Sequence, residues 1–533
     1  MNRKDFLQTA AILSGFGLLQ SACKNSNTIS GEIVGANSNV GHLLRNKTTY
    51  KPNKTIEIDT VIVGGGVTGL SAARWLKKNN YHNFLLFELD KNVGGNAAYG
   101  SNQISKYPWG AHYVPLPNND LEEYLSFLKE ANCVIDFKNN LPVYNEEYLC
   151  AEPQERLYIN GIWQPGLVPN YGLNDIDKKQ IASFLKLMEE FKTAKGKDGK
   201  FAFNIPVDTS SKDEVFTKLD ELTMQQWLLQ NNFTSKYLHE YINYCTKDDF
   251  GTEHNTISAW VGIHYFAARK GKAANANNSD VLTWPEGNGF FVNNLKTNTQ
   301  QHIRTNELVL SIKILPNSKV EVVTFQPTTK LCIAYQTKQC IVATPQFVNK
   351  KLLPWLQQRN NLIDEKLSYT PWMVANLQVQ SLEEKTGASL SWDNVIHNGE
   401  ALGYTVANHQ LISLQQQLQN ITYYKPLTND TPKIARQKAY ATTYLQWQEI
   451  VFNELQKIHP NIKQATKTFN VMLWGHAMAN PLPGVITDDY RAELNKSIDN
   501  KIHFAHTDIA GISIFEEGFY QGINAAKKVL SNV

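Results

Sequence analysis

The chain has 533 residues, of which 42% are hydrophobic and 11% aromatic, and its formal net charge is +3. This length exceeds what one simple core holds and predicts about two or three globular domains. The small charge, without a dense run of Lys or Arg, argues against nucleic acid as a partner.

The first residues have the features of an export signal rather than of a folded element. Arg3 and Lys4 resemble a twin-arginine signal with its second Arg replaced, and the apolar residues 10–19 that follow are too few to span a membrane. Small residues then lead to Cys23 in a pattern that resembles a lipobox. We therefore expect a signal peptide with a lipobox over residues 1–23, export to the periplasm or cell envelope, and a lipid anchor at Cys23. An uncleaved N-terminal anchor stays open as the alternative.

The next segment, residues 24–55, is rich in Asn, Ser, Gly and Thr and is expected to form a tether. Within it, residues 41–45 are less polar and are candidates for docking on the folded body.

Residues 61–69 read VIVGGGVTG and form the most informative stretch of the chain. The apolar start predicts a buried parallel strand. Gly64 would then make a tight turn, Gly66 would let the backbone approach a diphosphate, and Gly69 would let the next helix pack closely. A second apolar strand ends at Glu88, where an acid can bind a ribose. Strand, helix, strand and acid in this order predict a Rossmann-like dinucleotide-binding unit.

A glycine pair, Gly94 and Gly95, follows the acid, and Asn96 comes next. At this point the chain resembles the flavin-containing amine oxidase superfamily, which includes monoamine and polyamine oxidases, protoporphyrinogen oxidase and carotenoid desaturases. The resemblance implies that FAD is the dinucleotide and that backbone at Gly95 passes close to its phosphates and ribityl chain. Most members have Arg where this chain has Asn96, so a neutral contact replaces a charged one.

Further segments match the family in the order that it requires. Gly110 and Ala111 resemble its Gly-rich stretch beside the flavin ring, and the strand with Val309 resembles the one whose backbone meets the adenine. Near the C-terminus, Asp508 matches the acid that binds the ribityl chain, and Phe515 opens a helix whose N-terminus faces the pyrimidine end of the flavin. A helix N-terminus stabilises the negative charge of a reduced flavin.

These matches imply an α/β fold in which a Rossmann-like FAD-binding domain is interleaved with an α+β substrate-binding domain, as in the amine oxidases. The FAD-binding domain would take residues 56–115, 285–350 and 470–533, and the substrate-binding domain residues 116–284 and 351–469.

Apolar periodicity predicts the main elements of the substrate-binding domain. Helices are expected over residues 120–132, 180–195, 224–244 with a break in the middle, and 435–459, and a buried strand over residues 370–380.

Five cysteines remain after Cys23, without CxxC spacing, so we predict neither a metal site nor a disulfide framework. Cys332 and Cys340 lie on strand-like runs and could pair, but buried free thiols are the favoured interpretation. No Cys lies between Cys340 and the C-terminus, where some family members attach the flavin, so FAD should bind non-covalently. Asp248 and Asp249 are interpreted as a helix end.

A flavin oxidises its donor by accepting a hydride equivalent, so the protein must hold the donor close to the ring and exclude water. We therefore expect His and aromatic side chains around the ring. His112 follows the Gly-rich stretch and could orient the substrate or move a proton. Trp474 and His476 lie in the region that supplies one wall of the family's aromatic cage, and Tyr404 lies in a segment that lines the pocket or turns on the surface. Core packing is the alternative for each.

Amine oxidases usually carry a Lys in the strand that faces the flavin, and the comparable residues 370–377 contain none. This departure favours an electron acceptor other than oxygen, such as a membrane carrier, and oxygen stays open as the alternative. The resemblance implies oxidation of a small donor, an amine or polyamine. The alternatives are a desaturase or isomerase of a polyene or porphyrinogen-like ring, and a flavin-binding electron-transfer partner without its own substrate. Charged groups in the pocket would favour the amine, and an apolar tunnel the polyene.

Overall fold

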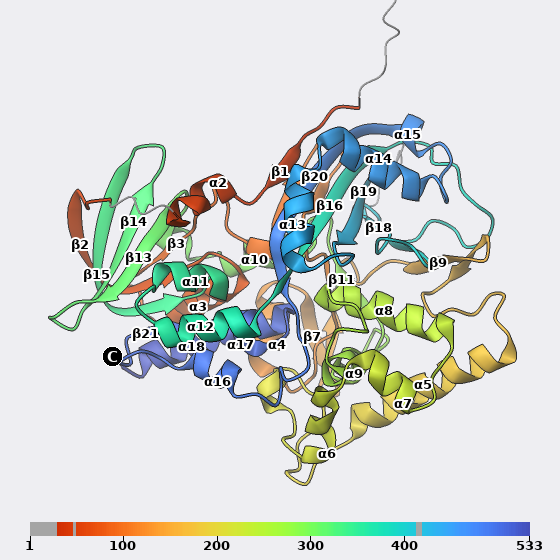
Figure 1. The fold of residues 1–533 in the computed structure, drawn as a ribbon, viewed down its shortest axis with the longest axis horizontal. Helices are drawn as coiled ribbons and strands as arrows, with labels where there is room; N and C mark the ends of the chain where they lie inside the picture. Colours follow the sequence, from red (N-terminus) through yellow and green to blue (C-terminus); the bar gives the residue numbers. More distant parts are fainter. Residues whose placement is uncertain (1–28, 46–49, 412–417, 533) are drawn as a thin grey trace, which may run out of the picture.

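The computed structural model describes residues 29–45, 50–411 and 418–532. Their elements form two interleaved parts, each built on one large β-sheet (Figure 1). The predicted export signal and Cys23 lie outside the described residues. Within the described ranges, no helix is both long enough and apolar enough to cross a membrane.

The first part is a sheet with a parallel centre. Across the sheet its main strands are β12 (Ile303–Arg304), β3 (Phe84–Phe87), β2 (Lys54–Val63), β15 (Leu331–Val342), β14 (Val320–Gln326) and β13 (Leu308–Ile314). A further strand, β21 (Ile502–Phe504), pairs in parallel with the end of β15. The parallel strands all end at one edge, where ligands bind in open α/β sheets.

Two helices, α3 (Val67–Lys78) and α18 (Phe515–Leu530), pack closely on each other beside this sheet. They can approach because small residues meet: a Cβ on Gly522 would lie only 2.1 Å from the Thr68 carbonyl oxygen. Since α3 directly follows β2, its N-terminus lies at the carboxyl edge of the sheet.

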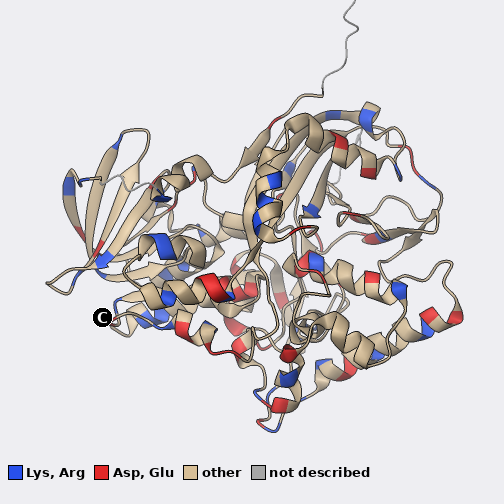
Figure 2. Ribbon diagram, viewed as in Figure 1, with Lys and Arg blue, Asp and Glu red and all other residues tan. Residues whose placement is uncertain are grey.

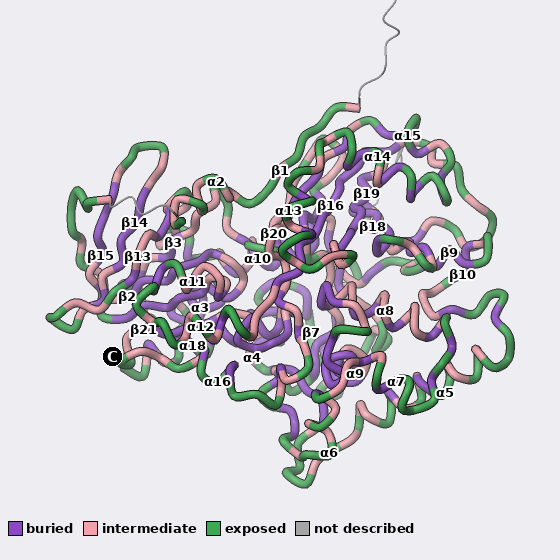
Figure 3. The backbone as a smooth tube through the Cα atoms, in the orientation of Figure 1, coloured by how far each residue is buried: buried purple, intermediate pink, exposed green. Residues whose placement is uncertain are grey.

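The second part contains a mostly antiparallel sheet. In spatial order its strands are β1 (Ile33–Gly35), β20 (Thr466–Ala479), β16 (Tyr369–Val379), β19 (Gln419–Pro426), β18 (Tyr404–Val406), β17 (Asp393–Ile396), β9 (Glu155–Ile159) and β10 (Ile162–Pro165). Every residue of the central strand β16 is buried (Figure 3). Helices α13 (Pro432–Ala441) and α14 (Tyr444–Leu455) pack on this sheet.

A helical lobe lies beside the second sheet (Figure 1). It contains α5 (Asp175–Thr193), α7 (Met224–Gln230), α8 (Lys236–Phe250) and α9 (Ala259–Ala267). Basic and acidic residues are distributed over both parts of the ribbon (Figure 2).

The remaining elements are short. They are α2 (Ser38–Gly41), η2 (His42–Arg45), η3 (Gly95–Ala97), β4 (Tyr99–Ser101), β5 (Lys106–Pro108), β6 (Tyr113–Pro115), α4 (Glu122–Glu130), β7 (Val134–Lys138), β8 (Leu141–Tyr144), η4 (Val207–Thr209), α6 (Glu214–Thr217), η5 (Lys218–Glu221), β11 (Val281–Thr283), α10 (Gly289–Leu295), η6 (Gln300–His302), α11 (Gln346–Leu352), α12 (Gln357–Lys366), α15 (Ile462–Ala465), α16 (Tyr490–Asn495) and α17 (Thr507–Ala510).

The fold class predicted from the sequence is confirmed, and most predicted elements are present as α4, α5, α7, α8 and β16. The single long helix expected over residues 435–459 is wrong, because α13 ends at Ala441 and α14 begins at Tyr444. Thr443 starts α14 with a capping box, in which its side chain and that of Gln446 each accept a hydrogen bond from the other's backbone amide. Because this capping box fixes the N-terminus of α14 at Thr443, the chain forms two helices although its apolar pattern is continuous.

Two predicted domain boundaries also change. Residues 470–479 belong to β20 of the second sheet, so the C-terminal piece of the first part begins after Ala479. The predicted tether is partly structured, because β1 pairs in parallel with β20 and the Val471 amide donates to the Glu32 carbonyl oxygen (2.9 Å). A strand can pair with a sheet edge through its backbone alone, without an apolar pattern of side chains. The composition of residues 24–55 therefore did not predict β1.

The five described cysteines are free and buried, which confirms the favoured interpretation. Cys332 and Cys340 both lie on β15, eight residues apart on one extended strand. At about 3.3 Å per residue their Cα atoms are far beyond the reach of a disulfide.

Candidate cofactor and substrate site

The carboxyl edge of the first sheet carries the Gly-rich turn, and its geometry requires glycine. Gly64 has a φ of +104°, and a Cβ on Gly69 would lie 1.9 Å from the Gly64 carbonyl oxygen. A Cβ on Gly66 would meet nothing within 4 Å, so the space in front of α3 is open. No side chain caps the N-terminus of α3, so its first amides face that space without a side-chain partner. Open space, a helix dipole and amide donors together fit a diphosphate.

Glu88 lies directly after β3, beside this turn. Its Oε2 accepts a hydrogen bond from the Gly65 amide (2.7 Å) and its Oε1 one from the Asp90 amide (2.9 Å). Burial raises the pKa of Glu88 to about 7, against the lowering effect of these amides. Val309 is buried on β13, two residues after Glu307, whose amide donates to the Glu88 carbonyl oxygen (2.9 Å). The predicted ribose and adenine residues are therefore neighbours.

The glycine pair and the second Gly-rich stretch form a continuous wall next to the turn. Gly95 has a φ of +56° and packs on the Gly-rich turn. Asn96 donates from Nδ2 to the Ala477 carbonyl oxygen (2.5 Å), and its own carbonyl oxygen accepts from the Ala111 amide (3.0 Å). A Cβ on Gly110 would lie 2.2 Å from that same Asn96 oxygen, so this position too needs glycine.

The C-terminal segment supplies an acid and a second helix N-terminus. Asp508 Oδ2 accepts hydrogen bonds from the Gln346 amide (2.9 Å) and the Tyr369 hydroxyl (2.7 Å), and Oδ1 lies 3.0 Å from His506 Nδ1. Burial by itself raises the pKa of Asp508, but His506 and these donors outweigh it and hold the pKa below its ordinary value. Phe515 begins α18, whose N-terminus has no side-chain cap.

A cavity of about 140 Å³ adjoins these motifs, between the first part and strands β16, β19 and β20. Gly110, Ala111 and Phe515 line it, so it opens onto the predicted position of the flavin ring. Asn288, whose amide donates to the Ala111 carbonyl oxygen (3.0 Å), also lines it. The buried Oδ1 of Asn288 has no hydrogen-bond partner among the described residues. A buried acceptor of this kind is expected to meet a ligand donor.

Aromatic rings form one side of the cavity. The His112 ring stacks on Tyr424 with centroids 4.4 Å apart. Trp474 faces Trp372 in the register of β20 and β16, and its Nε1 donates to the Trp109 carbonyl oxygen (2.6 Å). Burial lowers the pKa of His112 to about 4, so its imidazole is neutral near pH 7. The predicted residues His112 and Trp474 therefore line the cavity, whereas their catalytic role stays a prediction.

Charged side chains also line the cavity, at and near the end of α8. Asp249 pairs with Arg269 (Oδ2 to Nη1, 2.9 Å). Asp248 has no cationic partner among the described residues, and its Oδ2 accepts a hydrogen bond from the Tyr113 hydroxyl (3.0 Å). Burial, and next the charge of Asp249, raise the pKa of Asp248 to about 7. The two acids do lie at a helix end, with Gly251 as C-cap (φ +61°), but Asp248 and Asp249 both line the cavity.

The predicted catalytic residue Tyr404 lies elsewhere, and this prediction is wrong. Its side chain is fully buried, and its hydroxyl lies 2.6 Å from His459 Nε2 and 3.3 Å from Arg156 Nη2. Tyr404 is directly opposite Tyr423 on β19, whereas the next residue, Tyr424, lines the cavity. Successive side chains of a strand point to opposite faces, so Tyr404 belongs to the core face of the sheet.

His476 also lies outside the cavity. Its ring stacks on Phe347 (4.0 Å between centroids) and lies 5.8 Å from the Tyr369 ring, next to Asp508. Burial, then Arg436, lower its pKa to about 4. His476 thus lies on the cofactor side of β20 rather than on the substrate side.

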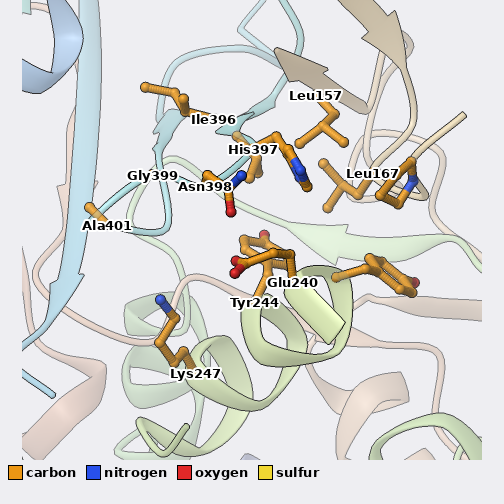
Figure 4. A pocket seen from close by; sticks show the side chains of 13 residues that line it. Leu157, Leu167, Glu240, Tyr244, Lys247, Ile396, His397, Asn398, Gly399 and Ala401 are labelled. Carbon is orange, nitrogen blue, oxygen red and sulfur yellow. The ribbon is translucent and has the colours of Figure 1, made fainter. Parts of the chain in front are cut away.

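A smaller cavity of about 30 Å³ lies on another face of α8, against residues 395–401 (Figure 4). Glu240, Tyr244 and Lys247 point into it from the helix, and His397 faces them. It touches none of the glycine motifs, so we place the reaction site in the larger cavity.

The sequence did not identify the charged side of the site. Asp248, Tyr113 and Arg269 are far apart along the chain and carry no motif spacing. The available signal was an acid pair at the end of an aromatic-rich helix. Trp372 lies on the strand that the family resemblance places beside the flavin, and that strand contributes Trp372 and Val374 to the cavity but no Lys.

Comparisons with known proteins agree with this fold. A model of the NAD(P)-binding Rossmann-like domain matches residues 62–130. Oxidoreductase PigB from Serratia sp. (strain ATCC 39006) is 21% identical, over 89% of this chain and 75% of that protein. Among solved structures, wild-type putrescine oxidase bound to putrescine has a TM-score of 0.65 at 15% identity, over 90% of this chain and 100% of that one. Cyclohexylamine oxidase from Brevibacterium oxydans IH-35A has a TM-score of 0.63 at 14% identity, over 90% and 99%.

Proposed function

We propose that this chain, which has the fold of the flavin-containing amine oxidase superfamily, is an FAD-dependent oxidoreductase whose donor is an amine or polyamine. The turn with the α3 N-terminus would hold the diphosphate, Glu88 the ribose and Asp508 the ribityl chain. The α18 N-terminus would face the pyrimidine end of the flavin. FAD, when bound, supplies the acceptor for a hydride equivalent.

The observation that supports an amine donor is the carboxylate of Asp248, which lines the cavity and has no cationic partner among the described residues. Asp248, Asp249 and Glu516 line it, and among the described residues Arg269 is the only Arg or Lys that does so. The cavity is therefore acidic overall and attracts a cation. A buried carboxylate without a cationic partner is costly, and an ammonium group beside it would lower that cost. A diamine or polyamine can place one ammonium at Asp248 and present its other, neutral end to the flavin.

The aromatic side supports oxidation of such a donor. His112, Tyr424, Trp372 and Trp474 would exclude water and hold an alkyl chain between their rings. His112 is neutral and does not repel the ammonium. Asp248 argues against a polyene, because an apolar ligand would leave this buried carboxylate without a cationic partner.

Other features of the proposal follow from the residues around the cavity. None of the five described cysteines lines it, which supports non-covalent FAD. The absence of Lys from β16 supports an electron acceptor other than oxygen, such as a membrane carrier. Export and a lipid anchor at Cys23 would place the enzyme at the cell envelope beside such a carrier.

Steady-state kinetics with monoamines, diamines and polyamines of matched length test the proposal. Asp248→Asn should raise the KM for diamines by about tenfold or more, the loss of one charge-assisted contact, with a smaller change in kcat. Asp489→Asn, at the exposed residue directly before α16, is the matched control and should change neither constant. Equal KM values for wild type and Asp248→Asn would overturn the assignment of Asp248.

A further inference from the structure

A short N-terminal segment bridges the loop after β3 and helix α11 after β15. After β1 leaves the second sheet, residues 36–45, which we call the strap, form α2 and η2 and reach the first sheet (Figure 1). The Asn37 amide donates to Asp90 Oδ1 (2.9 Å), and Gly41 lies against Leu89, in the loop after β3. The other end, η2, packs on α11, which follows β15. Because β2 lies between β3 and β15, the strap spans both loops that flank the Gly-rich turn.

The strap and α13 bring basic side chains to Gly475 and His476 of β20. Arg436 donates from Nη1 to the Gly475 carbonyl oxygen (2.6 Å), and α13 is marked by basic residues in Figure 2. Next to Gly475 is His476, the neighbour of Asp508. Arg45 and His42 of η2 lie close enough to His476 that, after burial and Arg436, their charges lower its pKa. Basic residues of η2, α13 and β20 thus lie close together, and His476 among them is next to Asp508, the acid predicted to bind the ribityl chain.

These cations are not neutralised by the protein. Neither Arg45 nor Arg436 forms an ion pair with a carboxylate within residues 29–45, 50–411 and 418–532. Asp430, the acid nearest to Arg436 in the sequence, pairs with Lys438 instead (2.7 Å). Cations that lie close together repel one another, and an anion bound between Arg45 and Arg436 would relieve this repulsion.

The Gly-rich turn and Asn96, on the opposite side of the cleft, supply no cationic side chain. The Gly-rich turn offers amides and the α3 dipole, which amounts to about half an elementary charge, and Asn96 is neutral. A dinucleotide diphosphate carries about two negative charges. Guanidinium groups suit it because their planar donors bind phosphate oxygens in pairs.

We propose that Arg45 and Arg436 bind the diphosphate of FAD and that the strap closes the cofactor cleft over it. This inference rests on the proposed function, because it requires FAD in the cleft. It gives the N-terminal segment a role in holding the cofactor besides that of a tether.

The test measures FAD affinity rather than turnover. The full chain is freed of flavin, and the dissociation constants of FAD and of riboflavin, which lacks the diphosphate, are measured by flavin fluorescence. Arg45→Ala combined with Arg436→Ala should weaken FAD binding about tenfold or more and leave riboflavin binding unchanged. It should also reduce the dependence of FAD affinity on salt.

Two control variants show whether the loss of FAD affinity is specific to the charges of Arg45 and Arg436. Lys433→Ala, an exposed position on the same helix as Arg436, should bind FAD like wild type. Arg45→Lys with Arg436→Lys keeps the charges and should recover most of the affinity.

An unchanged FAD constant in the double Ala variant, or an equal loss for riboflavin, would overturn the proposal. Wild-type protein that binds neither flavin would instead refute the proposed function itself.

Discussion

At the scale of single residues, the site is defined by which face of an element a side chain occupies. Tyr404 and Tyr424 lie on adjacent strands, yet one is in the core and the other lines the cavity. His112 could be placed from the sequence because backbone glycines fix its neighbourhood. Asp248 could not, because its role depends on Tyr113 and Arg269, which are brought to it only by folding.

The corrected position of Tyr404 predicts a change in stability without a change in catalysis. Tyr404→Phe removes the hydroxyl that meets His459 and Arg156 in the core. His459 and Arg156 would then lose a hydrogen-bond partner inside the core, which should lower the free energy of unfolding by about 1–3 kcal/mol. Urea unfolding would measure the loss. A fall in kcat/KM beyond about twofold, with the stability unchanged, would restore Tyr404 to the site.

The raised pKa of Asp248 predicts how binding of a cation depends on pH. Since this pKa is about 7, the carboxylate predominates only above pH 7, and affinity for a cation should rise between pH 6 and 8. Tetramethylammonium keeps its charge at every pH, so the pH dependence of its inhibition constant reports the titration of Asp248 rather than that of the ligand.

Asp248→Asn should remove the inflection in this pH profile. His112, with a pKa of about 4, should add none in this range. A flat profile for the wild type would contradict the assignment.

At the scale of elements, sequence patterns predicted those whose local signals act alone. The strand, turn and helix around Gly64 follow from short-range sterics, and β16 follows from its apolar run. The break between α13 and α14 depends on one capping box inside a continuous apolar pattern. β1 depends on the edge of β20, a partner far away in the chain. Elements that depend on neighbouring residues can therefore be predicted from the sequence, whereas pairing between distant segments cannot.

The Gly-rich turn predicts different outcomes for two neighbouring Ala substitutions. Gly69→Ala places a Cβ 1.9 Å from a backbone oxygen and should cost about 1–3 kcal/mol in stability, with or without FAD. Gly66→Ala meets open space, so the flavin-free protein should keep its stability within about 0.5 kcal/mol.

The Cβ at position 66 should nevertheless weaken FAD binding about tenfold, because it occupies the approach to the diphosphate. Thermal unfolding and flavin fluorescence separate the two effects. Normal FAD affinity in Gly66→Ala would show that the diphosphate lies elsewhere.

At the scale of the whole molecule, the two sheets enclose one site that neither could form alone. The first sheet supplies the helix N-termini and acids that suit a dinucleotide, and the second supplies the rings of Trp372, Tyr424 and Trp474. The charged side comes from the helical lobe through Asp248 and Arg269. The sequence predicted the cofactor half of this arrangement through its glycines. The substrate half arises from single residues on separate elements.

The most direct test is the absorbance spectrum of the purified full chain, recorded before and after anaerobic mixing with a short diamine. The proposed function predicts the bands of oxidised flavin and their loss on mixing. A neutral diol of the same length should leave them unchanged. A flavin spectrum that no amine bleaches would contradict the proposed donor, and a protein that takes up no FAD would contradict the account of the site as a whole.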